Sequence, residues 1–396
     1  MEPNPKSHKS RLLGADSIVS SRSRIVACAR KTLEVSALYL TAATLMAAPS
    51  DRCEVVFTDS QSAVLRADAL TGRPAVLTRD HNLMQPFGIA VGQNGEFFIS
   101  DTGCLSILGI NPITGEQRVI SRGGILGLPF GIAVERSGMI LVANAQALLR
   151  VDPETGAQTI VSSHGLFRAP IGVTVAENGD IFVVDALGPV IRVEPTSGAQ
   201  TLISSGGYLK RPQGIAVKGA DVYVTDVATA DMNFGVGRVV RVHIHTGKQF
   251  VLSEGGYLVG PVGIAVEPNG HLIVGDPYTI NPQSADLFDG GIIRIDKVTG
   301  AQKLVARGAQ SFVNPRGVAV IPHDGPSGER QWSFIAAVAR QRLQRSTLSS
   351  ARRATRGPVP NRIHPGAEVR SCLQAVGCNE LSRRHNWHSR VRQQSL

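Results

Sequence analysis

Six acidic or amide side chains recur along the sequence, each at the end of an apolar stretch. They are Asp59, Asp101, Asn144, Asp185, Asp226 and Asp276. A ring of such oxygens could hold a hard cation. However, the position recurs in every copy of a repeat, and Asp and Asn side chains accept backbone N–H bonds in tight turns. We therefore interpret the six as turn-forming residues rather than as metal ligands.

A histidine pair is the second candidate for chemistry. His243 and His245 lie two residues apart on an expected strand, so both side chains would point to the same side. Paired imidazoles can ligate a transition metal, but no third ligand lies near them in the sequence. We expect a solvated pair. The motifs G-x-G-x-x-G, Walker A, H-E-x-x-H and G-x-S-x-G are absent from the sequence.

The elements that must position these residues belong to an internal repeat. The pattern P-x-G-[IV]-[AT]-V occurs six times, at steps of 41 to 54 residues. Its copies begin at Pro86, Pro129, Pro170, Pro212, Pro261 and Pro315. A polar turn ending in T-G or S-G recurs in phase with it. Two motifs that recur together six times indicate a repeat architecture.

Each repeat reads as four short strands. In one copy these are residues 172–175, 180–185, 190–195 and 199–205, separated by turn signals such as E-N-G and P-T-S-G. No helical periodicity appears. Four antiparallel strands in about 42 residues are typical of a β-propeller blade.

The number of blades follows from the number of strands. Five copies are complete, whereas the last strand, 317–321, has no clear continuation and residues 54–79 supply three strands without an innermost one. We predict an all-β, six-bladed propeller of four-stranded antiparallel blades, closed by the N-terminal strands pairing with the last C-terminal strand. Residues 332–338 are a rival second strand for that last blade.

Charge divides the chain into three parts. Residues 51–326 carry 21 Lys/Arg and 25 Asp/Glu, whereas residues 327–396 carry thirteen Arg and three Glu. We predict a leader over 1–50, the propeller over 51–326, and a basic, disordered tail over 327–396. Because the basic excess lies outside the propeller, nucleic acid is not expected as the propeller's partner. We expect a monomer.

The N-terminal part contains an uncharged, mostly apolar run at residues 35–48, preceded by Arg30 and Lys31 and followed by small residues. This pattern is typical of a signal-peptide core, and the run is too short to span a bilayer well. The long preceding segment and Glu34 count against export. The location is therefore secreted or periplasmic if the run is a signal core, and cytoplasmic otherwise. No other segment is long enough to be transmembrane.

The motifs P-x-G-I-A-V, N-G-x-[IL]-x-V-x-D and R-V-D-P-x-T-G-x-Q resemble those of NHL-repeat propellers. They are also similar to the six-bladed senescence-marker (SMP-30)/gluconolactonase-like superfamily. The resemblance covers about 51–321 and implies the propeller fold. The superfamily includes lactonases, lyases and protein- or RNA-binding scaffolds, so the fold does not select one function.

The lactonase resemblance also implies a divalent ion at the channel mouth, held by a Glu, an Asn and an Asp, several of them immediately before an innermost-strand glycine. In this chain those positions hold Phe87, Phe130, Ile171, Gln213, Val262 and Arg316. A hard cation needs several oxygen ligands, which this set cannot provide. We therefore expect no cofactor and a non-catalytic protein. Two alternatives remain: a lactonase- or lyase-type enzyme that hydrolyses a lactone or ester, with or without a divalent cation, and an RNA- or protein-binding scaffold.

Two long loops indicate where a ligand would bind. Insertions at 227–237 and 277–290 fall between the second and third strands of their blades, on the mouth face. We expect a small molecule or a peptide to bind there, and Arg316 is the first candidate because a cation beside an apolar mouth needs an anion. The predicted ligand-binding residues are Arg316, Gln213, Phe87, Phe130, Tyr278, Asp286, Asp289, Asp231 and Asn233.

Overall fold

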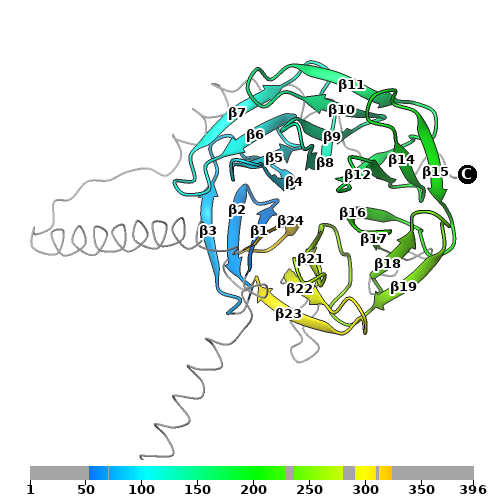
Figure 1. Cartoon of the computed structure of the whole chain (residues 1–396). Coiled ribbons are helices and arrows are strands. Elements are labelled where there is room, and N and C mark those ends of the chain that lie inside the picture. Colours follow the sequence, from blue (N-terminus) through cyan, green and yellow to red (C-terminus); the bar gives the residue numbers. More distant parts are fainter. Residues whose placement is uncertain (1–52, 70, 228–235, 280–289, 309–311, 323–396) are drawn as a thin grey trace, which may run out of the picture. The chain divides into compact units, whose positions relative to one another are not determined.

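The computed structural model describes residues 53–69, 71–227, 236–279, 290–308 and 312–322. In these ranges 24 strands form six four-stranded antiparallel sheets, arranged as blades around a ring (Figure 1). The predicted all-β, six-bladed propeller is thus confirmed. Among the described residues, no helix has the length and apolar character needed to cross a membrane. The predicted leader, signal core and basic tail lie outside these ranges.

The blades are numbered here along the chain, and their strands are given from the ring axis outward. Blade 1 contains β24 (Pro315–Pro322), β1 (Cys53–Asp59), β2 (Ala63–Asp68) and β3 (Pro74–Arg79). Blade 2 contains β4 (Pro86–Val91), β5 (Phe97–Asp101), β6 (Ser106–Ile110) and β7 (Gln117–Arg122). Blade 3 contains β8 (Pro129–Val134), β9 (Ile140–Asn144), β10 (Ala147–Val151) and β11 (Gln158–Ser163).

The second half of the ring repeats this order. Blade 4 contains β12 (Pro170–Val175), β13 (Ile181–Asp185), β14 (Val190–Val193) and β15 (Gln200–Ser204). Blade 5 contains β16 (Pro212–Lys218), β17 (Asp221–Asp226), β18 (Arg238–His243) and β19 (Gln249–Glu254). Blade 6 contains β20 (Ile264–Val266), β21 (Leu272–Asp276), β22 (Gly291–Ile295) and β23 (Gln302–Arg307).

Blade 1 closes the ring in the predicted way. Its innermost strand β24 comes from the C-terminal side and pairs antiparallel with β1, with Val320 opposite Val55 and Ala319 opposite Val56. Strand β1 therefore has a partner on both sides and leaves no open edge. The four places of this blade are filled by described strands, and the rival segment 332–338 lies outside the described residues.

The hydrophobic core consists of six layers, one between each pair of neighbouring blades. Along β1, Val55 and Phe57 pack toward blade 6, whereas Val56 packs toward blade 2. Side chains alternate between the two faces of a strand, and both faces of a blade are covered. This explains why the second strand of each repeat reads as an uninterrupted apolar run.

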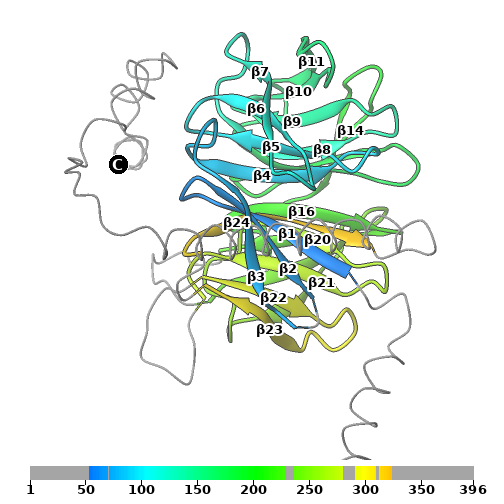
Figure 2. The ribbon, with the colours of Figure 1, turned by 90° about the vertical axis from the view of Figure 1, so that its left-hand side faces the viewer.

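The innermost strands contact one another in a closed cycle and run along the ring axis, as the edge-on view in Figure 2 shows. Each begins beside a glycine that nearly touches the next blade. A Cβ on Gly131 would lie 2.7 Å from the carbonyl oxygen of Ile171 in blade 4. The same approach to the next blade is made by Gly88, Gly131, Gly172, Gly214, Gly263 and Gly317. Only glycine allows blades to pack this closely.

Outer strands are joined by glutamine side chains. Gln158 of blade 3 accepts the N–H of Ile125 at 2.8 Å and donates to Ser121 Oγ at 2.8 Å and to the Gly123 carbonyl at 3.0 Å, all in blade 2 or its connection. Equivalent bonds are made by Gln117, Gln158, Gln200, Gln249 and Gln302. In blade 1 the corresponding residue is Pro74, and the pairing of β1 with β24 closes the ring there instead.

Candidate functional site

The candidate site lies on the mouth face, defined here as the face where innermost strands begin and second strands end. It is built from the connections between blades and from the turns between second and third strands. The buried acids at the ends of the second strands shape it. Asp185 Oδ2 accepts the N–H groups of Arg168 and Ala169, both at 2.7 Å, and Oδ1 accepts that of Leu187 at 3.0 Å. One carboxylate thus fixes two loops.

The other residues of this acidic set make the same kind of bond. Backbone N–H groups of the preceding connection are accepted by Asp59, Asp101, Asn144, Asp185, Asp226 and Asp276. This confirms that they hydrogen-bond to backbone in turns. Burial raises the pKa of Asp276 to about 6, although Val259, Tyr278 and Gly260 donate backbone N–H bonds to its carboxylate. These bonds place Tyr278 at the start of the second long loop.

Three predicted site residues come together beside the channel. The rings of Phe87 and Phe130 meet edge to face, with centroids 5.3 Å apart. The guanidinium carbon of Arg316 lies 5.6 Å from the Phe87 centroid. A cation in this position is attracted by the aromatic face. The structure therefore forms an aromatic floor with one arginine across it.

Arg316 is half-buried and has no hydrogen-bond or ion-pair partner among the described residues. Burial lowers the pKa of its guanidinium, and the nearby Tyr278 and Asp59 oppose that shift. An arginine remains protonated in proteins even so. A partly buried cation that lacks a hydrogen-bond acceptor favours binding of an anionic group.

The remaining predicted site residues are placed separately. Gln213 lies on blade 5, where its Nε2 donates to the Arg211 carbonyl at 3.4 Å. Tyr278 packs over the connection into blade 6, since a Cβ on Gly260 would lie 2.5 Å from its Cδ2. Four predicted residues of the long loops lie outside the described residues: Asp231, Asn233, Asp286 and Asp289. Their part in the site stays a prediction.

The histidine pair differs from the expectation in one respect. His243 ends β18, but His245 lies beyond it in the turn, so the two are not side by side on a strand. Their rings meet edge to face with centroids 5.6 Å apart. In the part of the chain that the structure describes, no group of three or more His, Cys, Asp or Glu side chains could hold a metal ion.

Exposed apolar side chains distinguish the two faces of the ring, a feature that the sequence analysis missed. Six large ones lie on mouth-face connections: Ile125, Leu166, Leu187, Tyr208, Val236 and Val313. On the opposite face, the described residues include one, Val298. The others lie on outermost strands. For Ile125, Leu166 and Tyr208, the signal in the sequence is the variable segment between the repeated G-G or H-G turn and the following proline.

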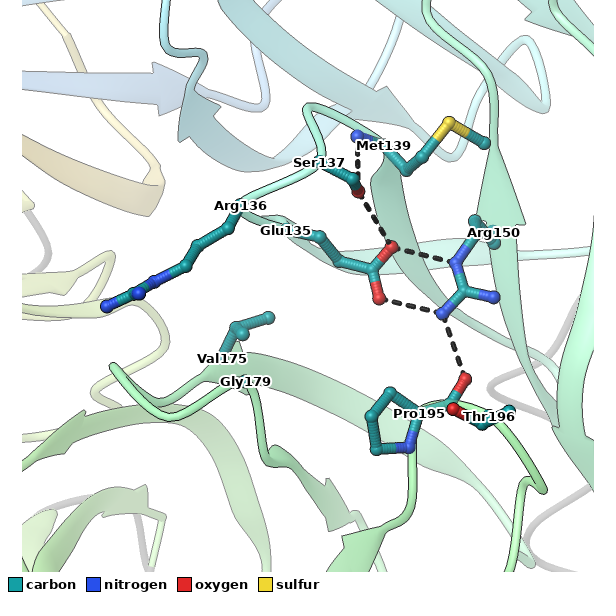
Figure 3. A pocket seen from close by; sticks show the side chains of 9 residues that line it. All are labelled: Glu135, Arg136, Ser137, Met139, Arg150, Val175, Gly179, Pro195 and Thr196. Atoms are coloured by element: carbon teal, nitrogen blue, oxygen red, sulfur yellow. Dashed lines mark hydrogen bonds and ion pairs between the residues drawn. The ribbon is translucent and has the colours of Figure 1, made fainter.

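The opposite face carries ion pairs and a groove of about 480 Å³ between blades 3 and 4 (Figure 3). Arg150 donates to both carboxylate oxygens of Glu135 at 2.7 Å, and to the Pro195 carbonyl of blade 4 at 3.1 Å. Figure 3 shows the Arg136 side chain directed away from this pair. The arginine and the glutamate of blade 3 satisfy each other, and the bond from Arg150 to Pro195 joins this pair to blade 4, so we interpret the group as a link between blades.

Comparisons with known proteins agree with the fold. No protein-family model matches the sequence, and no curated protein matches it. Solved structures do match, 1184 chains in number. One is a chain in the crystal structure of a nidogen/laminin complex, with 14% sequence identity and a TM-score of 0.56. The match covers 68% of this chain and 98% of that chain. At this identity the likeness supports the propeller fold alone.

Proposed function

We propose that the protein is a non-catalytic binding propeller whose mouth captures an anionic group of a small molecule or peptide. Arg316 would hold the anion, and Phe87 and Phe130 would contact an apolar part of the same ligand. One observation carries the proposal: Arg316 stacks over Phe87 and has no acceptor among the described residues. Guanidinium groups bind carboxylates through two parallel hydrogen bonds, so a carboxylate suits the position.

Two further observations support a binding role. The repeat motifs are similar to those of NHL-repeat and SMP-30/gluconolactonase-like propellers, among which are binding scaffolds. The similar solved chain comes from a complex between two proteins. We infer that the mouth face, with its exposed apolar side chains, is the surface that meets a partner.

The test compares two probes that differ only in charge: N-acetyl-4-fluorophenylalanine and its primary amide, followed by fluorine NMR. The carboxylate should bind the wild type more tightly than the amide. Arg316→Ala should weaken the carboxylate roughly 10- to 100-fold, the range for a lost charge-assisted hydrogen bond. Arg316→Lys should retain part of the affinity because the charge stays but the two-pronged geometry is lost.

Arg136→Ala is the matched control, because it removes an exposed arginine from the opposite face. It should leave binding unchanged. Equal binding of the carboxylate by wild type and Arg316→Ala, with unchanged thermal unfolding, would contradict the proposal. So would a stoichiometric divalent ion in the purified protein whose removal abolishes binding.

A further inference from the structure

We propose that one arc of the mouth face docks an acidic, amphipathic peptide segment of a protein partner. The inference rests on the proposed function, because it takes the mouth face as the binding surface. The arc spans the connections between blades 3 and 4 and between blades 4 and 5, with the turn of blade 4 between them. Its members are three cations and three large apolar residues: Leu166, Arg168, Leu187, Tyr208, Lys210 and Arg211.

Hydrogen bonds to the backbone, and a close approach of two backbone segments, make this arc continuous. Asp185 binds the N–H groups of both Arg168 and Leu187. The turn that carries Leu187 then meets the next connection, since a Cβ on Gly188 would lie 3.2 Å from the Leu209 carbonyl. These buried bonds hold the arc in place without using its exposed side chains.

The connection between blades 4 and 5 also carries the other two cations, Lys210 and Arg211. Asp226 accepts the N–H groups of Lys210 at 2.7 Å and Arg211 at 2.9 Å. The three cations therefore lie on two successive connections between blades, and a buried carboxylate holds the backbone of each.

The three cations are exposed, and none has a side-chain hydrogen bond or ion pair to another described residue. Apart from the buried acids at the ends of the second strands, the acids on the described mouth-face connections are Asp80 and Glu254. Glu254 pairs with Arg238 at 3.1 Å, and Asp80 lies on the connection from blade 1. The described part of the arc thus carries positive charge that an anionic partner would complement.

The apolar members indicate what else the partner brings. Leu187 is 70% exposed, Tyr208 47% and Leu166 37%. Leu166 and Tyr208 lie two residues before Arg168 and Lys210, and Leu187 shares the carboxylate of Asp185 with Arg168. A peptide can place carboxylates and apolar side chains in alternation. A nucleic acid carries a phosphate at every nucleotide and would bring charges onto the apolar members as well. The mixed chemistry of the arc therefore favours an acidic peptide.

The experiment uses the full chain and fluorescein-labelled peptides of sequence ELEFELE and EGEGEGE, followed by fluorescence polarisation. The variant is Arg168→Ala/Lys210→Ala/Arg211→Ala. The matched control, Arg73→Ala/Arg136→Ala/Lys303→Ala, removes three exposed cations elsewhere, so net charge and the C-terminal basic segment are the same in both. The arc variant should weaken ELEFELE at least about tenfold and the control less than about twofold. EGEGEGE should bind the wild type more weakly than ELEFELE.

The outcomes separate this inference from the proposed function. Loss of ELEFELE binding in the arc variant, with the fluorinated carboxylate unaffected by Arg316→Ala, would support the arc and contradict the Arg316 site. Equal losses in the arc and control variants, or no binding of ELEFELE to the wild type, would overturn the arc. A labelled dT oligonucleotide that binds more tightly than ELEFELE and depends on the same three cations would also overturn it, because the partner would then be a nucleic acid.

Discussion

Glu54 is a buried carboxylate on the strand that closes the ring. It is 7% exposed, its Oε1 lies 3.6 Å from Arg66 Nε, and its Oε2 has no hydrogen-bond partner in the part of the chain that the structure describes. Burial raises the pKa of Glu54 from 4.5 to about 7; Arg66 opposes the shift and Asp68 adds to it. The folded protein therefore binds this proton more tightly than the unfolded chain does.

This gives a prediction for stability against pH. The contribution of Glu54 is present below about pH 4.5 and is lost as pH rises to about 7, on the order of 3 kcal/mol in total. Glu54→Gln removes the titration. The difference in unfolding free energy between variant and wild type should therefore shift in favour of the variant between pH 5 and pH 8. Urea unfolding at several pH values measures it, and a pH-independent difference would show that Glu54 does not titrate in this window.

Cys53, the neighbouring residue, links blade 1 to blade 6. Its thiol donates to Glu267 Oε1 at 2.9 Å, and Arg294 Nε donates to the other carboxylate oxygen at 2.8 Å. Burial, with the bond to Glu267, raises the pKa of Cys53 to about 12. Since the thiolate is the reactive form, this cysteine is structural.

At the scale of the elements, different blades form an equivalent ion pair from residues at different positions of the repeat. In blades 2 and 4, an acidic residue five positions before the buried acid that ends the second strand pairs with an arginine. In blade 4 this acid is Asp180, which lies 2.9 Å from Arg192. In blade 3 that place holds Met139, and Glu135 supplies the carboxylate from the end of the innermost strand. The ion pair is thus present in blade 3 although its acid occupies a different position of the repeat. Aligning the repeats by sequence does not show this.

The glycines of the inner ring provide an element-scale prediction. In Gly131→Ala the new methyl group would lie 2.7 Å from the Ile171 carbonyl, whose backbone is held in blade 4. We expect a loss of about 3 kcal/mol in unfolding free energy. Gly127→Ala is the control, because its nearest neighbour, the Ala145 Cβ, would be 3.6 Å away. Denaturant unfolding of both variants measures the effect, and equal losses would contradict close blade packing as the cause.

The ring as a whole depends on one strand pairing. Strands β1 and β24 lie at opposite ends of the described chain, and Phe312, just before β24, packs edge to face on Phe57 with centroids 4.8 Å apart. Without this segment, β1 would become an open edge and the core layer between blades 6 and 1 would lose part of its covering. We therefore expect the closed propeller to unfold as a single cooperative unit.

Truncation tests this closure. A chain ending at residue 308 lacks Phe312 and β24, whereas a chain ending at residue 326 keeps both. We expect the shorter chain to unfold at least about 10 °C lower and to self-associate through the open edge of β1. The longer chain should unfold like the full protein. Circular dichroism melting and size-exclusion chromatography measure both effects, and matching curves for the two truncations would show that β24 does not close the ring.

The sequence by itself determined the blade count, the four-strand repeat and the closure by β24. These follow from local patterns: short apolar runs for the strands, glycine and proline in turns, and an incomplete first and last repeat. It also predicted Arg316, Phe87 and Phe130 as ligand-binding residues, because a position before the repeated glycine lies at the channel mouth in any propeller of this register.

Only the tertiary structure decided which side chains meet across blades. Three examples arise when neighbouring blades pack: the bond from Gln158 to Ser121, the bond from Arg150 to the Pro195 carbonyl, and the arc that joins Arg168 to Lys210. All three join residues about one repeat apart and depend on the distance and angle between packed sheets. A repeat pattern specifies what each blade is, but the contacts between blades depend on how closely two twisted sheets approach.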